Sequence, residues 1–137
     1  MKRPFFLVII ICIGLSGHVS AALGDSEDYI ANLFGKPTNQ GFPDARGITT
    51  NVYEKGNYVI LVQFLQHLSL AESYTRVDQH DFSQDEIAAL LEGNSSGRGW
   101  GKNPDKMEWE RSDHKVHAWL QTISGRPTFL FQAVQAK

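Results

Sequence analysis

The sequence predicts an α+β fold, in which a single small domain contains a mostly antiparallel sheet of about five strands with two short helices packed on one face. The first observation is an apolar run at residues 58–65, which contains no Gly or Pro and has the length of a strand. The second is a series of short segments in which apolar and polar residues alternate. The third is a pair of segments with helical spacing and capping residues.

Residues 1–22 have the features of a signal peptide, so that residues 23–137 are expected to form the domain. Lys2 and Arg3 precede an apolar stretch, and the small residues around Ala21 suit a signal peptidase. The apolar stretch is too short for a good transmembrane span, and an uncleaved anchor is the alternative. We therefore expect a periplasmic or secreted protein with no stable transmembrane segment after processing.

Cys12 is the only cysteine, and it lies inside the predicted signal peptide. The processed chain would therefore be disulfide-free and held together by its hydrophobic core. Isoleucines precede Cys12 where lipid attachment needs small residues, so a lipoprotein is not expected. Loss of Lys2 and Arg3 leaves 11 basic residues against 15 acidic residues, a net charge of −4, which argues against nucleic acid or an anionic membrane as a partner.

The first helix is expected directly after the signal peptide, at residues 25–34. Asp25 or Ser26 can cap its N-terminus. Ile30 and Phe34 lie on one face of this helix, which is typical of a helix that packs on a sheet. The Gly that follows suits the helix end.

The run at residues 58–65 is expected to be the central strand, because both of its faces are mostly apolar and neither can be left in water. We expect a helix over one face and loops over at least part of the other. A loop at residues 38–50 and a short strand at residues 49–53 precede it. The alternating segment at residues 68–77 is expected to pair with it in an antiparallel manner.

Residues 82–93 carry the clearest local signal, for a second helix. Ser83 and Glu86 form a capping box, and Phe82 and Ile87 form a hydrophobic staple across it. Each of these features contributes about 1 kcal/mol, and here they all indicate the same start of a helix.

Three further strands are expected after a Gly-rich loop at residues 94–106, namely residues 107–111, 116–121 and 128–134. Short turns join them. In the middle strand of the three, one side carries Val116, Ala118 and Leu120, and the other carries His117, Trp119 and Gln121.

Two segments resemble known groups of proteins. Residues 24–77 combine a Gly before a short helix with Leu33-Phe34-Gly35-Lys36-Pro37, a strand with Tyr53, and Val62-Gln63-Phe64. This segment resembles the small envelope proteins of the SmpA/OmlA (BamE) type and, more broadly, the β-lactamase-inhibitor-protein-like fold, which implies a short helix on an antiparallel sheet. The chain departs from that group because it has no lipoprotein Cys and inserts the helix at residues 82–93.

The second half carries Asp78, Leu90, Leu91, Trp100, Trp109, Arg111 and Asp113 at a recurring spacing. In this respect residues 74–120 are similar to small exported bacterial proteins with no assigned function. The resemblance implies no activity.

Candidate catalytic groups are present but lack the context that catalysis needs. Ser95 lies in a G-x-S-x-G sequence, which in hydrolases needs a strand before it and a helix after it. Here a helix is expected before Ser95 and a loop after it, which favours a flexible segment at the end of the helix over a nucleophile. Glu72, Glu108 and Glu110 are read as a solvated sheet face rather than a carboxylate pair. Polar turn residues are favoured over metal ligands for Asp78, His80 and Asp81, and for Asp113, His114 and His117. We expect no catalytic residue, no metal and no cofactor.

Trp100 lies between two glycines and has two interpretations. It either folds back as an anchor for its loop, or it forms a partner contact together with Arg98 and Lys102. The leading hypothesis for function is a non-enzymatic exported domain that binds a protein of the cell envelope. An inhibitor of a secreted enzyme and a small hydrolase are the alternatives.

Overall fold

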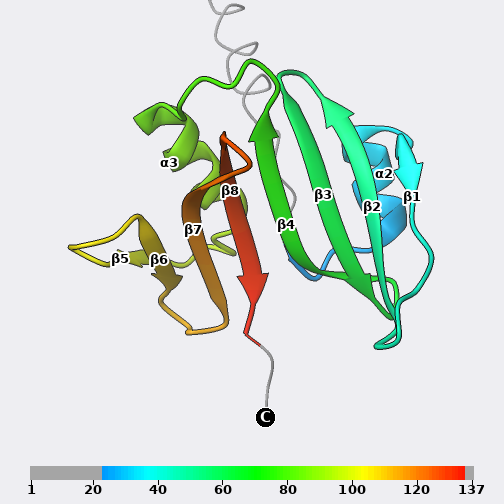
Figure 1. Cartoon of the computed structure of the whole chain (residues 1–137). Coiled ribbons are helices and arrows are strands. Elements are labelled where there is room, and N and C mark those ends of the chain that lie inside the picture. Colours follow the sequence, from blue (N-terminus) through cyan, green and yellow to red (C-terminus); the bar gives the residue numbers. More distant parts are fainter. Residues whose placement is uncertain (1–22, 135–137) are drawn as a thin grey trace, which may run out of the picture.

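A single antiparallel sheet of eight strands makes up most of the computed structural model, which describes residues 23–134 (Figure 1). Neighbouring strands lie in the order β1-β2-β3-β4-β8-β7-β6-β5. The strands are β1 (Asn39–Gln40), β2 (Ile48–Lys55), β3 (Tyr58–Leu65), β4 (Leu68–Arg76), β5 (Trp100–Lys102), β6 (Glu108–Arg111), β7 (Val116–Ile123) and β8 (Arg126–Ala133). The helices are α2 (Glu27–Phe34) and α3 (Gln84–Gly93). The predicted signal peptide at residues 1–22 lies outside the described residues.

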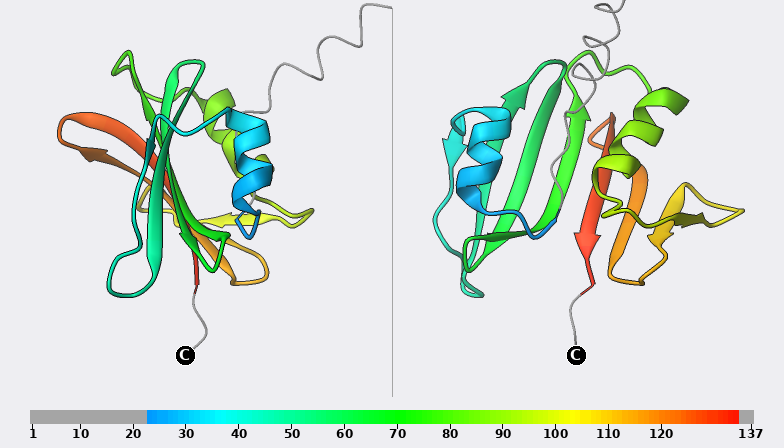
Figure 2. Two further views of the ribbon diagram at one scale, coloured as in Figure 1. Left: turned by 90° about the vertical axis from the view of Figure 1, so that its right-hand side faces the viewer. Right: turned by 180° about the vertical axis from the view of Figure 1, so that it is seen from behind.

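The predicted architecture of about five strands with two helices on one face is wrong. Within residues 23–134 the sheet has eight strands, and its twist places α2 behind β2 and β3 while α3 lies beside β8 and β7 (Figure 2). The two edge strands, β1 and β5, were expected to be loops. Each has three residues or fewer and takes its extended form from pairing with a neighbour, β2 or β6. A local pattern cannot predict a strand of that length, because too few side chains alternate along it.

One side of the sheet forms the hydrophobic core, and this core runs through all the long strands. The largest fully buried apolar side chains that the strands contribute are Tyr53, Ile60, Val62, Phe64, Tyr74, Phe129 and Phe131. Most of the aromatic rings contact one another at tilted or perpendicular angles, whereas Tyr58 and Phe82 are stacked. For example, the Phe129 and Phe131 centroids lie 5.1 Å apart with an interplanar angle of 43°. Such tilted contacts are the favoured arrangement of aromatic pairs.

Both helices contribute apolar side chains to this core and begin at the expected caps. Ser26 caps α2 by accepting a hydrogen bond from the Tyr29 backbone N–H. Ser83 and Glu86 form the complete capping box of α3. Ile30 and Leu90 are at most 1% exposed. Among the described residues, neither helix is long and apolar enough to cross a bilayer.

Candidate functional site

The side of the sheet that faces away from the core carries an extended surface, here called the open face. In Figure 1 this face is toward the viewer, and no helix lies in front of β2, β3, β4, β8 or β7. The strand register defines two rows of cross-strand neighbours on it. The middle row is Val52, Leu61, Ser73, Leu130, Trp119 and Glu108, and the lower row is Thr50, Gln63, Ala71, Gln132, His117 and Glu110.

The middle row is mostly apolar, with Val52, Leu61, Leu130 and Trp119, where the solvent-facing side of a sheet usually carries polar residues. Leu61 is 38% exposed and Ile123, farther along the Trp119 side of β7, is 43% exposed. Loops were expected over this side of the central strand, yet Leu61 remains open to solvent. An uncovered apolar row of this kind, bordered by polar side chains, is typical of an interaction surface.

Trp119 lies where two cavities of the open face meet. The first cavity, about 310 Å³, extends over β3, β4 and β8 and is lined in part by Leu61, Gln63, Leu130 and Gln132. The second is a shallower hollow of about 880 Å³ over β5, β6 and β7. Trp119 lines both. Both volumes are in the range of ligand sites, roughly 300–1,000 Å³.

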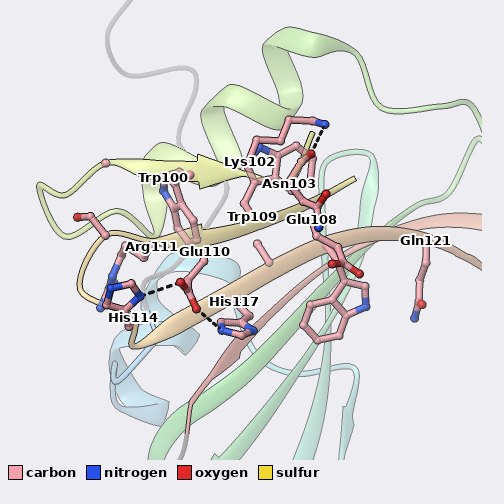
Figure 3. Close-up of a pocket in the computed structure, with 15 residues that line it drawn as sticks. Trp100, Lys102, Asn103, Glu108, Trp109, Glu110, Arg111, His114, His117 and Gln121 are labelled. Atoms are coloured by element: carbon pink, nitrogen blue, oxygen red, sulfur yellow. Dashed lines mark hydrogen bonds and ion pairs between the residues drawn. The ribbon is translucent and has the colours of Figure 1, made fainter. Parts of the chain in front are cut away.

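A carboxylate held by two imidazoles marks one end of the open face (Figure 3). Glu110 on β6 receives His114 Nδ1 at 2.7 Å on one oxygen and His117 Nε2 at 2.8 Å on the other. These two hydrogen bonds hold the pKa of the Glu110 carboxyl below its ordinary value. The cluster forms because β6 and β7 pair Glu110 with His117, while the turn brings His114 back. Within residues 23–134 no three such groups converge to hold a metal ion.

Of the three predicted contact residues, Trp100 and Lys102 line the hollow over β5, β6 and β7 that Trp119 also lines, whereas Arg98 does not. The Trp100 indole is half-buried, donates from Nε1 to the Leu91 carbonyl at 2.8 Å and packs edge-on against Phe131. Lys102 Nζ donates to the Asn103 and Lys106 carbonyls and lies 5.8 Å from the Trp109 ring centroid. Their role as partner contacts stays a prediction.

Arg98 lies beside a buried polar network that joins the β6–β7 turn to the end of α3. Its Nε is 3.4 Å from the Asp113 carboxylate. Arg111 binds the same carboxylate through two hydrogen bonds of 2.9 Å each and also donates to the Asn94 carbonyl. The Arg111 guanidinium holds the pKa of Asp113 well below its usual range. The charge of Arg111 therefore stabilises the fold through these contacts.

The three carboxylates considered for catalysis do not converge. Glu108 and Glu110 lie on the open face, whereas Glu72 points into the core from β4 and is 2% exposed. Ser95 is also buried, and its hydroxyl accepts a hydrogen bond from the Gly97 backbone N–H. Neither arrangement places an acid, a base or a nucleophile at a common point.

One feature of the sequence indicates the open face. In β7, the side that carries the polar residues His117 and Gln121 also carries Trp119. A large aromatic residue on the polar side of an alternating strand is the observation that points to a binding surface.

Comparisons with known proteins assign no family. No family model matches the chain, and no curated protein matches it. Among solved structures, the chain is similar to a cysteine-rich secretory protein from Staphylococcus aureus, with 13% sequence identity and a TM-score of 0.49. The match covers 81% of this chain and 44% of that chain, so this chain spans less than half the length of that protein. A likeness at this level leaves the function to be argued from the site itself.

Proposed function

We propose that this protein is an exported binding domain without catalytic activity, which holds its partner on the open face. The observation that carries the proposal is the apolar middle row around Trp119, which no described element covers. Burying such a row against a partner would gain roughly 25 cal/mol for each Å² removed from water. The two cavities that meet at Trp119 make the surface concave, which allows it to bind a partner of complementary shape.

Two further observations support a binding role over the hydrolase alternative. The candidate carboxylates lie on different sides of the sheet, with Glu72 in the core and Glu108 on the open face. Glu110, the third candidate carboxylate, is bound by His114 and His117 and has a lowered pKa, which is the wrong direction for a general acid. Export is supported by the signal features of residues 1–22.

Carbene footprinting tests the proposal. The purified domain is labelled alone and in the presence of an envelope extract, and the labelled residues are located by mass spectrometry. We expect protection at Leu61, Trp119 and Ile123, and none at Tyr29, which is 55% exposed on α2. Protection confined to α2, or no protection at all, would contradict the proposal.

A matched pair of variants makes the test specific. Leu61→Arg places a charge in the middle row and is expected to abolish the protection of Trp119. Tyr29→Arg introduces the same side chain at an exposed position away from the row and is expected to leave that protection unchanged. If both variants retain it, the open face is not the binding surface.

A further inference from the structure

We propose that the ligand of the open face is a carbohydrate chain, with Trp119 as the platform on which one sugar ring stacks. This inference rests on the proposed function and names its ligand class.

The cavity over β3, β4 and β8 is lined by uncharged side chains. Leu61, Leu130 and Ile123 form its apolar part, and Gln63, Ser73 and Gln132 carry its amides and hydroxyl. Glu72 also borders the cavity, but its carboxyl group points into the core, where Tyr74 and Asn94 donate to it. A cavity with this lining favours an uncharged ligand that is apolar on one face and rich in hydroxyl groups at its edge.

A sugar ring fits this description, and the groups around Trp119 are suited to bind one. The flat faces of a pyranose carry C–H bonds, which suit an indole surface, and its rim carries hydroxyls that both donate and accept. Glu108 is the cross-strand neighbour of Trp119 on one side, and Gln121 follows on the same strand face. A carboxylate and an amide beside an aromatic platform can accept from and donate to neighbouring hydroxyls. The hollow over β5–β7 continues from Trp119, so a chain of rings has room beyond the first.

The backbone hydrogen bonds of the central strands argue against an extended peptide as the ligand. Peptides that add to a sheet bind through the free N–H and C=O groups of an edge strand. The open face is centred on β4, β8 and β7, each of which is paired on both sides within the sheet. A peptide lying across them would leave its own backbone polar groups largely unsatisfied, whereas a carbohydrate chain has no such ladder to complete.

Fluorine NMR provides a direct test, because the chain contains three tryptophans, Trp100, Trp109 and Trp119. The protein is labelled with 5-fluorotryptophan and titrated with chitotetraose and, separately, with cellotetraose. We expect at least one of these probes to shift the Trp119 resonance. Absence of a shift at Trp119 with both probes at millimolar concentration would overturn the inference.

Variants separate stacking from a general effect on the fold. Trp119→Ala is expected to weaken binding of the active probe by about tenfold or more, which corresponds to roughly 1.4 kcal/mol. Gln132→Leu is expected to weaken it as well, while Tyr29→Ala, an exposed aromatic residue on α2, leaves it unchanged. Equal binding by Trp119→Ala and the parent would overturn the inference.

Failure of this inference is distinguishable from failure of the proposed function. If neither oligosaccharide shifts Trp119 but the envelope extract still protects Leu61 and Trp119 from labelling, the proposed function stands and the carbohydrate assignment is wrong. If footprinting shows no protection there either, the proposed function falls with it.

Discussion

Glu72 is a carboxyl group that the fold surrounds completely. Its Oε1 accepts hydrogen bonds from the Tyr74 hydroxyl at 2.8 Å and from Asn94 Nδ2 at 3.3 Å. Its Oε2 is buried and has no hydrogen-bond partner among the described residues. Burial raises the pKa of Glu72 to about 8 from its ordinary value of 4.5. At neutral pH the group is therefore mainly a neutral acid.

This raised pKa predicts that stability falls with pH. Between pH 4.5 and about 8 the folded state binds a proton at Glu72 that the unfolded state has lost. The stabilisation is complete below the lower value and is lost as pH rises through the upper one, with a slope of up to about 1.4 kcal/mol per pH unit. Urea unfolding at pH 5, 6, 7 and 8 measures this slope.

Glu72→Gln isolates the contribution of this residue, because an amide keeps the shape without titrating. The free energy of unfolding of this variant is expected to depend less on pH than that of the parent across the same range. Glu54→Gln, at an exposed position of β2, is the control and should keep the parental slope. Parallel curves for Glu72→Gln and the parent would mean that Glu72 is ionised in the folded protein.

At the scale of the element, α3 is the helix whose start is most fully determined by its own sequence. Ser83 accepts from the Glu86 backbone N–H at 3.1 Å, and Glu86 accepts from the Ser83 backbone N–H at 2.9 Å. The Glu86 carboxylate also contacts Tyr58 and Arg76, which ties the cap to β3 and β4. Leu90 is 1% exposed in the core. The helix therefore depends on a local cap and on tertiary packing.

Substitutions in α3 separate these two contributions. Ser83→Ala removes the cap and is expected to lower the free energy of unfolding by about 1 kcal/mol. Leu90→Ala leaves a cavity in the core and is expected to cost roughly 2–5 kcal/mol. Gln84→Ala, at an exposed first-turn position, should change stability by less than about 0.5 kcal/mol. Denaturant midpoints unchanged by the first two substitutions would show that α3 does not pack as described.

At the scale of the whole molecule, the chain is joined to the sheet from Leu23 onward. The Leu23 backbone N–H donates to Asn94 Oδ1 at 2.9 Å, and the Gly24 N–H donates to the Ser69 carbonyl at 2.8 Å. These bonds connect the first described residues to the end of α3 and to β4. A cleavage site just before them would leave the fold intact.

We therefore expect the exported protein to begin at Ala22 or Leu23. Signal peptidase cleaves after small residues, and the residues that follow are held by Asn94 and Ser69. Intact-mass measurement of the exported form decides the point. A mass that includes residues 1–20, or a lipid adduct on Cys12, would contradict the prediction.

The hairpin turn at Gln66–His67 shows how tertiary contacts override local preference. Both residues have positive φ, 54° and 67°, a conformation that favours Gly or Asn. The turn forms because the start of α2 holds it: the Glu27 N–H donates to the His67 carbonyl, and Glu27 Oε2 lies 2.7 Å from His67 Nδ1. Nothing within the two turn residues themselves predicts this geometry.

Features that depend only on neighbouring residues could be predicted from the sequence. The α3 cap at Ser83, the α2 cap and the central strand Tyr58–Leu65 follow from short-range hydrogen bonds and from the period of apolar side chains. Three features could not be predicted in this way, because they depend on tertiary contacts. They are the two short edge strands, the burial of Glu72 and the surface centred on Trp119. Each requires residues far apart in the chain to meet, and the free energy of such contacts depends on the register and twist of the assembled sheet.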